Sequence, residues 1–336
     1  MTDLTTGYLG FALRNPLVAS ASPLSHTVDG VRRLADGGVA AVVLHSLFEE
    51  EIEDGAARHA SLAEAGTDSF AESLSYFPSV PDLAPGSQHL SLLERAARSV
   101  DVPVIASLNG ATAGGWTSFA RRLQDAGAAA IELNISPFVT GPDVSGRDVE
   151  ERHLEILGLV KQAVHVPVAV KLHPYFSSMA DMARRLEDAG ADGLVLFNRF
   201  LAPDIDARRL AVSLAVGLSH PADGRLARVW IALLRRQLHM ALAASTGVDG
   251  PEDVATYLLA GADVVMTTSA LLRHGPSHAA ALLDGLAAWM AASGFTDVGQ
   301  LRGLLAVQAD GGDGTGPRSG YVAALRAANA STAGPW

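Results

Sequence analysis

Four segments of the chain share one pattern of polar and apolar positions, in which an apolar run follows a glycine and ends in polar residues. They are DGGVAAVVLHS (36–46), DAGAAAIELNIS (125–136), DAGADGLVLFNR (188–199) and LAGADVVMTTS (259–269). Two further buried runs with polar ends follow Val-Pro, in VPVIASLNG (102–110) and VPVAVKLHP (166–174). Such recurrence indicates a helix-strand unit used repeatedly. Because parallel sheets build their sites at the C-terminal ends of strands, the polar ends also predict where chemistry takes place.

Apolar runs bounded by turn residues predict eight strands, separated by stretches with helical periodicity. The predicted strands are 16–20, 40–45, 104–108, 130–134, 168–172, 193–198, 240–245 and 263–267. The predicted helices are 27–36, 89–99, 117–125, 149–163, 179–188, 226–238, 251–259 and 277–291. Three helices end in Ala-Gly-Ala, where the glycine can adopt the left-handed C-terminal cap. Strict alternation of continuously apolar strands with helices predicts an α/β fold, a single (β/α)8 TIM barrel.

Three segments depart from this alternation. Residues 4–13 predict an N-terminal hairpin that covers the barrel floor, and residues 48–88 form a long loop after the second strand, placed to cover the site. The glycine-rich run 310–320 is typical of a linker, and a short helix is expected over 321–328. We therefore expect a barrel over residues 1–300 and a partly flexible C-terminal extension over residues 301–336.

Composition limits the classes of function. Hydrophobic residues make up 49% of the 336 residues and charged residues 18%, which suits a large core. The net charge of -11, without a Lys/Arg-rich stretch, argues against a nucleic-acid partner. The absence of cysteine excludes disulfides, thiolate ligands and a cysteine nucleophile. Without a signal peptide or a long apolar run, we expect no membrane span and a cytoplasmic location.

Lys171 is the most informative single residue. It lies in VAVKLHP with apolar neighbours on both sides, where an ammonium group has a desolvation cost unless an anion or strong acceptor meets it. A side chain that points into the barrel, toward its mouth, suggests a role in the site. The structural alternative is a buried ion pair with a neighbouring strand, for instance with Glu132.

Other polar residues also follow the predicted strands. Asn109, Asn134 and Asn198 carry amides suited to the edge of a planar heterocycle, although a single such asparagine is usually a turn residue. The last two strands end in the small polar runs 245–247 and 267–269, each shortly before a helix, where barrels commonly hold a phosphate. His45 and His173 are candidates for proton transfer. His274 and His278 are four residues apart but lack an acidic partner motif, so no metal is expected.

Six stretches, taken together and in order, resemble a known family. They are NPLVASASPLS, VIASLNG, IELNIS, VAVKLHP, STGVDGPEDV and LAGADVVMTTSALLRHGP. Over residues 4–292 the chain resembles the dihydroorotate dehydrogenase family of FMN-dependent barrels, and more closely its uncharacterised dihydroorotate dehydrogenase-like branch. The resemblance implies an FMN-dependent oxidoreductase that acts on CH–CH groups of a small molecule. A homodimer is an expectation from this resemblance alone.

The resemblance also implies roles for particular residues. The backbone of residues 19–21 would lie against the flavin ring, Lys171 would meet the N1/O2 edge of the ring, and the ends of the last two strands would hold the FMN phosphate. The implied cofactor-binding residues are Ala19, Ser20, Ala21, Ser46, Asn109, Asn134, Lys171, Asn198, Thr246, Gly247, Thr268 and Ser269.

The chain departs from the family pattern on the substrate side. Ser136 is followed by Pro137 and Phe138, so the usual cysteine and second asparagine are missing, and His45 stands where the family generally has lysine. These differences argue against dihydroorotate as substrate. We predict hydride transfer between a small cyclic or unsaturated substrate and flavin N5. Lys171 is expected to act in catalysis, with the proton assigned to one of Ser136, His173, Tyr175 and His45.

Two other functions remain compatible with the residues. Lys171 could act as the Schiff-base nucleophile of an aldolase-type barrel. Alternatively, because the catalytic base that is usual in the family is missing, the protein could bind flavin without catalysing a reaction.

Overall fold

The computed structural model of the chain describes residues 2–52, 86–110, 116–135, 142–198, 204–213, 217–307 and 326. The predicted linker 310–320, most of the predicted helix 321–328 and the greater part of the long loop after the second strand lie outside these residues.

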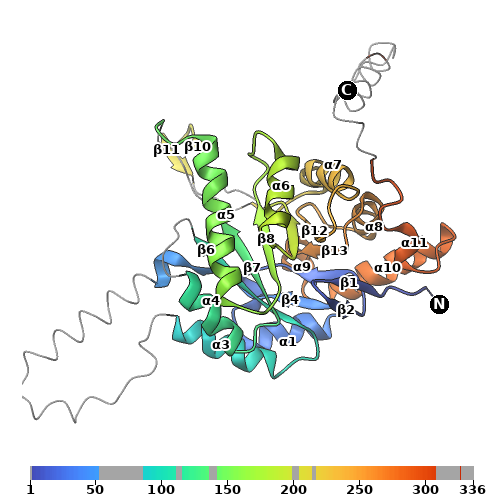
Figure 1. Ribbon diagram of the computed structural model, residues 1–336. Coiled ribbons are helices and arrows are strands. Elements are labelled where there is room, and N and C mark those ends of the chain that lie inside the picture. Colours follow the sequence, from blue (N-terminus) through green and yellow to red (C-terminus); the bar gives the residue numbers. More distant parts are fainter. Residues whose placement is uncertain are drawn as a thin grey trace, which may run out of the picture.

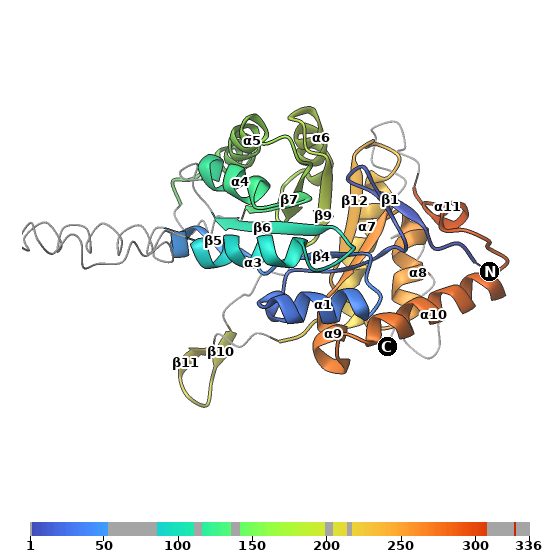
Figure 2. The same ribbon diagram turned by 90° about the horizontal axis from the view of Figure 1, so that it is seen from below.

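The core of the molecule is a closed parallel barrel (Figures 1 and 2). Its strands, each close to a predicted one, are β3 (Leu17–Ala19), β4 (Ala41–Val43), β6 (Val104–Gly110), β7 (Ala130–Ile135), β8 (Val168–Leu172), β9 (Gly193–Leu196), β12 (Ala241–Ser245) and β13 (Val264–Thr267). Strand β4 pairs with both β3 and β6, which closes the sheet on itself. The predicted (β/α)8 barrel is confirmed.

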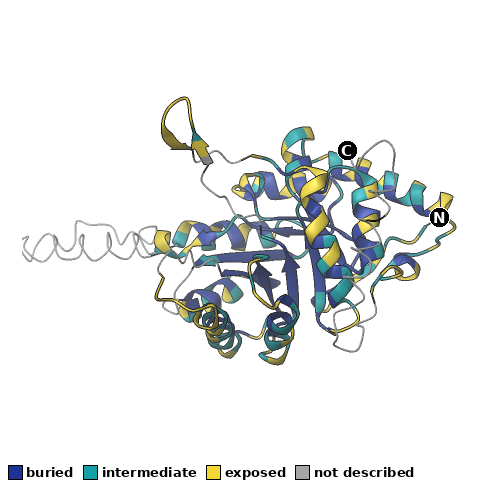
Figure 3. Ribbon diagram, turned by 90° about the horizontal axis from the view of Figure 1, so that it is seen from above, coloured by how far each residue is buried: buried dark blue, intermediate teal, exposed yellow. Residues whose placement is uncertain are grey.

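Helices cover the outside of the barrel, and their buried faces point toward the strands (Figure 3). They are α1 (Val28–Asp36), α3 (Ser87–Ala97), α4 (Trp116–Asp125), α5 (Gly146–Ala163), α6 (Met179–Asp188), α7 (Arg225–Leu234), α8 (Pro251–Ala260) and α10 (His278–Ala292). Helix α4 illustrates the pattern, because it buries Trp116, Phe119, Ala120 and Leu123, which share one helical face. Each Ala-Gly-Ala end has its glycine at positive φ, as predicted, between 92° and 122°.

Helix α7 is shorter than the sequence predicts. The expected range was 226–238, but the helix ends at Leu234. Arg235 turns its guanidinium toward the barrel floor, where it lies 2.8 Å from the carboxylate of Asp263. The following residues close a tight turn in which the N–H groups of Gln237 and Leu238 both donate to the carbonyl of Leu234. The predicted C-terminal end of this helix, at residue 238, was therefore wrong. The apolar pattern continues past Leu234 and carries no sign of the ion pair that Arg235 forms.

An N-terminal hairpin closes the barrel floor, as predicted. It consists of β1 (Thr6–Tyr8) and β2 (Phe11–Leu13). Tyr8, Leu9 and Leu13 are buried and pack in one cluster with inward-facing strand residues such as Ile105 and Val195. The polar ends of the strands therefore lie at the opposite, open end of the barrel.

The second barrel strand is interrupted by a bulge. A short strand, β5 (Leu47–Phe48), continues β4 along β6. Val43 pairs with Ile105 and Leu47 pairs with Leu108, so four steps along β4–β5 correspond to three along β6. The extra residue is accommodated around His45 and Ser46, a distortion that is common next to active sites. The sequence predicted one continuous strand to residue 45, because a bulge leaves no mark in an apolar run.

Several elements were not predicted. A hairpin of β10 (Asp204–Asp206) and β11 (Ala211–Ser213) projects away from the barrel after β9 (Figures 1 and 2). A short helix, α9 (Ser269–His274), begins immediately after β13, and α11 (Val298–Leu301) follows α10. Two 3-10 helices, Pro23–Ser25 and Pro221–Gly224, shape loops at the barrel mouth. None of the helices within the described residues is long and apolar enough to cross a membrane.

Candidate active site

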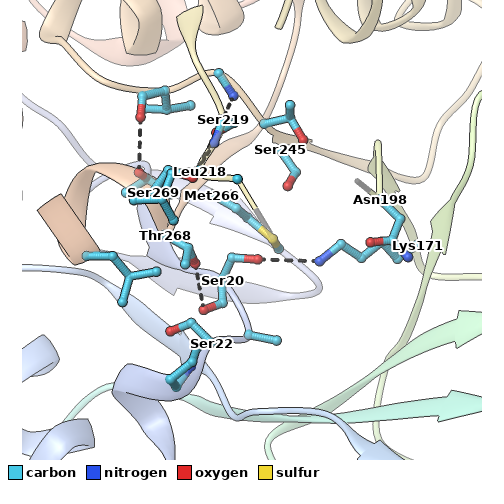
Figure 4. A pocket seen from close by; sticks show the side chains of 18 residues that line it. Ser20, Ser22, Lys171, Asn198, Leu218, Ser219, Ser245, Met266, Thr268 and Ser269 are labelled. Atoms are coloured by element: carbon cyan, nitrogen blue, oxygen red, sulfur yellow. Dashed lines mark hydrogen bonds between the residues drawn. The ribbon is translucent and has the colours of Figure 1, made fainter. Parts of the chain in front are cut away.

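A cavity of about 260 Å³ opens at the C-terminal ends of the barrel strands. Its lining is built from small and polar residues that follow β3, β12 and β13, together with the loop residues 217–219 (Figure 4). The predicted site residues that line it are Ser20, Ala21, Lys171, Asn198, Thr246, Gly247, Thr268 and Ser269. The structure therefore brings together residues that are up to 249 positions apart in the sequence.

Lys171 crosses the barrel mouth. It belongs to β8, which lies four strands from β3 in either direction around the sheet. Its ammonium Nζ is 3.4 Å from Ser20 Oγ at the end of β3, and 3.2 Å from the carboxylate of Glu132 on β7. Only 6% of the Lys171 surface is exposed. The structural alternative, a buried ion pair with Glu132, is therefore present, and the lysine also lines the cavity.

The three asparagines lie at the same end of neighbouring strands. Strand register places Asn134 level with Asn109 on one side and with Lys171 on the other. Asn198, which follows β9, donates from Nδ2 to Asn134 Oδ1 at 2.7 Å. Of the three, Asn198 lines the cavity, whereas Asn109 and Asn134 do not belong to its lining.

The end of β12 makes a close backbone turn beside the cavity. Gly247 has a φ of 68°, and a Cβ placed on it would come within 2.5 Å of the Gly224 backbone nitrogen. Thr246, with a φ of 81°, shares this left-handed turn. Only glycine fits the second position, and this residue lines the cavity.

Ser219 links this turn to the first residue of α9, and the sequence did not predict it. Its backbone N–H and its hydroxyl both donate to Ser269 Oγ, at 3.0 and 2.9 Å, and its Oγ accepts from the N–H of Gly247 at 3.3 Å. The residue precedes a 3-10 helix instead of ending a strand. A search for polar residues at the ends of predicted strands therefore could not find it. The one signal in the sequence is the loop proline two positions later, Pro221.

Helix α9 begins at the cavity. Its N-cap, Thr268, makes no side-chain cap bond to the helix and instead donates to the carbonyl of Ser20 at 3.1 Å. The leading amides of a helix have no partner within the helix. In TIM barrels, the loops after the last two strands and a short extra helix commonly bind phosphate.

The histidine candidates His45 and His173 do not belong to the lining of the cavity. His45 packs between His26 and His89, with ring centroids 3.9 and 4.6 Å away. Burial lowers the pKa of His45, and burial with the nearby His45 and His26 lowers the pKa of His89 to about 3. Burial, followed by the charges of His153 and Lys171, lowers the pKa of His173 to about 4. Both candidates are therefore held toward the neutral form.

The remaining predicted residues take other positions. Tyr175 is 76% exposed, and its ring stacks on that of His173. Ser46 shares a 2.9 Å hydroxyl–hydroxyl hydrogen bond with Ser107, and Ala19 is buried in the core. Ser136 lies outside the described residues. In the described part of the chain, no group of three or more histidine, aspartate or glutamate side chains is arranged to hold a metal ion.

Comparison with known proteins identifies relatives of the chain. The sequence profile of the family described as dihydroorotate dehydrogenase matches residues 81–290. The chain is similar to "Dihydroorotate dehydrogenase B (NAD(+)), catalytic subunit" of Methanothermobacter thermautotrophicus, with 30% identity over 319 residues, 90% of this chain and 98% of that protein. The protein of the same name from Thermoplasma acidophilum is 28% identical over 290 residues, 82% of this chain and 90% of that protein.

The match extends over almost the whole barrel, and the fold agrees with it. The predicted family resemblance is therefore confirmed. The chain belongs to the dihydroorotate dehydrogenase family and is a flavin-dependent oxidoreductase of that type.

Proposed function

We propose that the cavity binds FMN and that the chain transfers a hydride between a small cyclic or unsaturated substrate and the flavin. One observation carries this proposal. A buried ammonium, Lys171, and a set of hydroxyl and backbone donors at the ends of β12 and β13 line the same cavity. A planar ring that accepts negative charge and a phosphate are complementary to those two halves.

The residues present suit the two parts of FMN. On one side the small Ser20 and Ala21 allow a flat ring to approach the backbone, and Asn198 offers an amide. On the other side, the turn at Gly247 packs closely against the backbone of Gly224 and lines the cavity, and Thr268 and Ser269 bring hydroxyl groups. This donor set favours a phosphate over an apolar group.

When bound, FMN supplies the site that gains or loses the hydride. The chain contributes position and charge. The ammonium of Lys171 is fixed by Ser20 and Glu132, so it is available to stabilise negative charge on a reduced ring without rearrangement. For the accompanying proton, we keep Ser136, His173, Tyr175 and His45 as candidates, with Lys171 as the residue that meets the ring.

The substrate is proposed to differ from dihydroorotate. The relatives named above are dihydroorotate dehydrogenases. This chain, however, has Ser136-Pro137-Phe138 after the fourth strand and His45 at the second, where the family pattern differs. The ring of His45 also packs against the rings of His26 and His89. We therefore expect little or no turnover of dihydroorotate and activity on another compound with a reducible C=C bond.

The names of the relatives suggest further partners. Because they are named catalytic subunits with NAD(+), we propose that a second subunit and a nicotinamide acceptor are candidates for this chain as well. A homodimer and a cytoplasmic location stay predictions from the sequence. Sedimentation of the purified chain, alone and after co-expression with neighbouring genes, would separate a homodimer from a heteromeric complex.

The absorption spectrum of the purified protein tests the proposal. We expect a yellow protein with flavin bands, or uptake of one FMN per chain on reconstitution. Lys171→Met should lower the rate of flavin reduction by at least about a hundredfold, the usual size of one lost electrostatic contact in a transition state. A colourless protein that takes up no FMN would contradict the proposal. Trapping of a carbonyl substrate on Lys171 by borohydride would instead support an aldolase.

A further inference from the structure

Glu132 is a buried carboxylate inside the barrel that takes no direct part in the proposed hydride or proton transfer. It is 1% exposed, and it does not belong to the lining of the cavity. It lies two residues before Asn134 on β7, and Asn134 is level with Lys171, so Glu132 is one layer deeper than the lysine. Its Oε1 is 3.2 Å from Lys171 Nζ.

The surroundings of Glu132 offer little compensation for burying a charge. Its second oxygen, Oε2, is buried and has no hydrogen-bond partner. The phenol of Tyr8, from the floor hairpin, is also buried without a hydrogen-bond partner. Burial and then the charges of Glu132 and Asp263 raise the pKa of Tyr8 well above its ordinary value, so the phenol stays neutral. A buried ion pair of this kind adds little to stability compared with apolar side chains of the same size.

Glu132 and Lys171 form the one ion pair of the described residues in which both side chains are buried. Among the buried residues of the described chain, the other carboxylate is Asp263, which pairs with Arg235 and Arg302 at the floor. The floor carboxylate is thus neutralised locally by two guanidinium groups. Glu132, by contrast, forms one ion pair within the described residues, with the ammonium of Lys171.

We propose that Glu132 is a positioning residue that fixes the Lys171 ammonium under the flavin site and offsets part of its charge. Two consequences follow if FMN binds as described under the proposed function, on which this inference rests. First, the lysine side chain is held between Glu132 beneath it and Ser20 across the mouth. Second, the carboxylate reduces the positive potential at the ring, so it keeps the midpoint potential of the flavin lower than the lysine alone would set it.

The decisive experiment measures the midpoint potential of bound FMN in variants of the full chain, by reduction in the presence of indicator dyes. Glu132→Gln keeps the shape of the side chain and removes its charge. We expect the equilibrium to shift about tenfold toward reduced flavin, a rise of about 30 mV for a two-electron couple. Glu132→Met should shift the potential in the same direction, whereas Glu132→Asp, which keeps the charge, should restore it to near the wild-type value.

A matched control removes a paired carboxylate elsewhere. Glu150 on α5 is 2.7 Å from Arg185 on α6, outside the barrel. Glu150→Gln should change thermal stability at most and leave the flavin potential unchanged. A merely structural role for Glu132 predicts that same result for Glu132→Gln.

The outcomes separate this inference from the proposed function. If the wild-type protein takes up no FMN, the proposed function itself fails. If the wild-type protein is yellow and the potential of Glu132→Gln is unchanged or lower, this inference alone is overturned. It is also overturned if the folded Glu132→Gln protein loses FMN, because removing a negative charge should not weaken binding of an anionic cofactor. If Glu132→Gln and Glu132→Met fail to fold while Glu132→Asp folds, the carboxylate is structural and the inference is wrong.

Discussion

Asn198 donates a 2.7 Å hydrogen bond to Asn134 above the strand that carries Lys171 between them. Asn198 follows β9, and Asn134 is the last but one residue of β7, so the bond bridges two strands that are not themselves paired. Each amide thereby orients the other at the mouth of the barrel. The two residues are expected to act as one unit beside the lysine.

Removing either asparagine side chain should weaken FMN binding. Removing both should reduce the binding free energy by less than the sum of the two single losses. We expect Asn134→Ala and Asn198→Ala each to raise the FMN dissociation constant about tenfold, or about 1.4 kcal/mol, the size of one lost hydrogen bond. Because the side chains share a bond, the double variant should show a coupling of at least about 0.5 kcal/mol. Quenching of flavin fluorescence on binding measures the constants. Asn15→Ala, which removes hydrogen bonds to Gly38 and Leu17 at the barrel floor, should lower stability and leave the FMN constant unchanged.

A methyl group at Gly247 should abolish FMN binding or destabilise the fold. The added Cβ would lie 2.5 Å from the Gly224 nitrogen and 2.9 Å from the His220 carbonyl, both backbone atoms that cannot move aside. Gly275→Ala is the matched control, because Gly275 also has a positive φ, 88°, but no atom lies within 4 Å of its Cβ position. The control should cost only the backbone strain, about 1–2 kcal/mol. Equal losses of FMN affinity in the two variants would contradict the proposed phosphate end of the cavity.

Ser219→Ala should loosen the β12–α9 end of the cavity. The substitution removes the hydroxyl that bonds Ser269 and accepts from Gly247, so we expect the FMN dissociation constant to rise about three- to tenfold. Ser99→Ala removes a comparable bond, from the Ser99 hydroxyl to the Ala96 carbonyl, away from the site. Isothermal titration with FMN should show the loss for Ser219→Ala only. A similar loss in both variants would mean that the effect is a general one on stability.

The stability of the protein should fall as the pH is lowered below about 6.5, in part through His89. The pKa of His89 is about 3 in the folded chain, against 6.5 when unfolded, because burial and the nearby His45 and His26 disfavour its charge. The unfolded chain therefore binds a proton that the folded chain does not, over the window between those values. His89 alone should lower the free energy of unfolding by about 2 kcal/mol between pH 7 and pH 5. His173, whose pKa is lowered to about 4, acts in the same direction.

Urea denaturation at pH 7 and pH 5 measures this dependence. His89→Gln should reduce the difference between the two pH values by about 2 kcal/mol, whereas His165→Gln, at an exposed position, should leave it unchanged. If His89→Gln keeps the full difference, the histidine cluster is not the source of the acid sensitivity.

The sequence by itself determined the barrel and the end of the barrel that carries the site. Apolar runs of strand length, separated by amphipathic helices, require a parallel sheet with both faces buried, and eight such units favour a closed barrel over an open sheet. The period of the pattern fixed the strands closely, and glycine at helix ends was predictable because few other residues adopt positive φ. Lys171 was identifiable because a charge within an apolar strand has a high desolvation cost.

Only the tertiary structure decided what each polar strand end contacts. That Lys171 meets both Glu132 and Ser20 depends on the closure of the sheet, which places β8 opposite β3. The bulge at His45, the shortened α7 and the contribution of Ser219 likewise depend on contacts between distant segments. Local sequence encodes propensity and burial, whereas the partner of a side chain depends on register and closure, which no short segment contains.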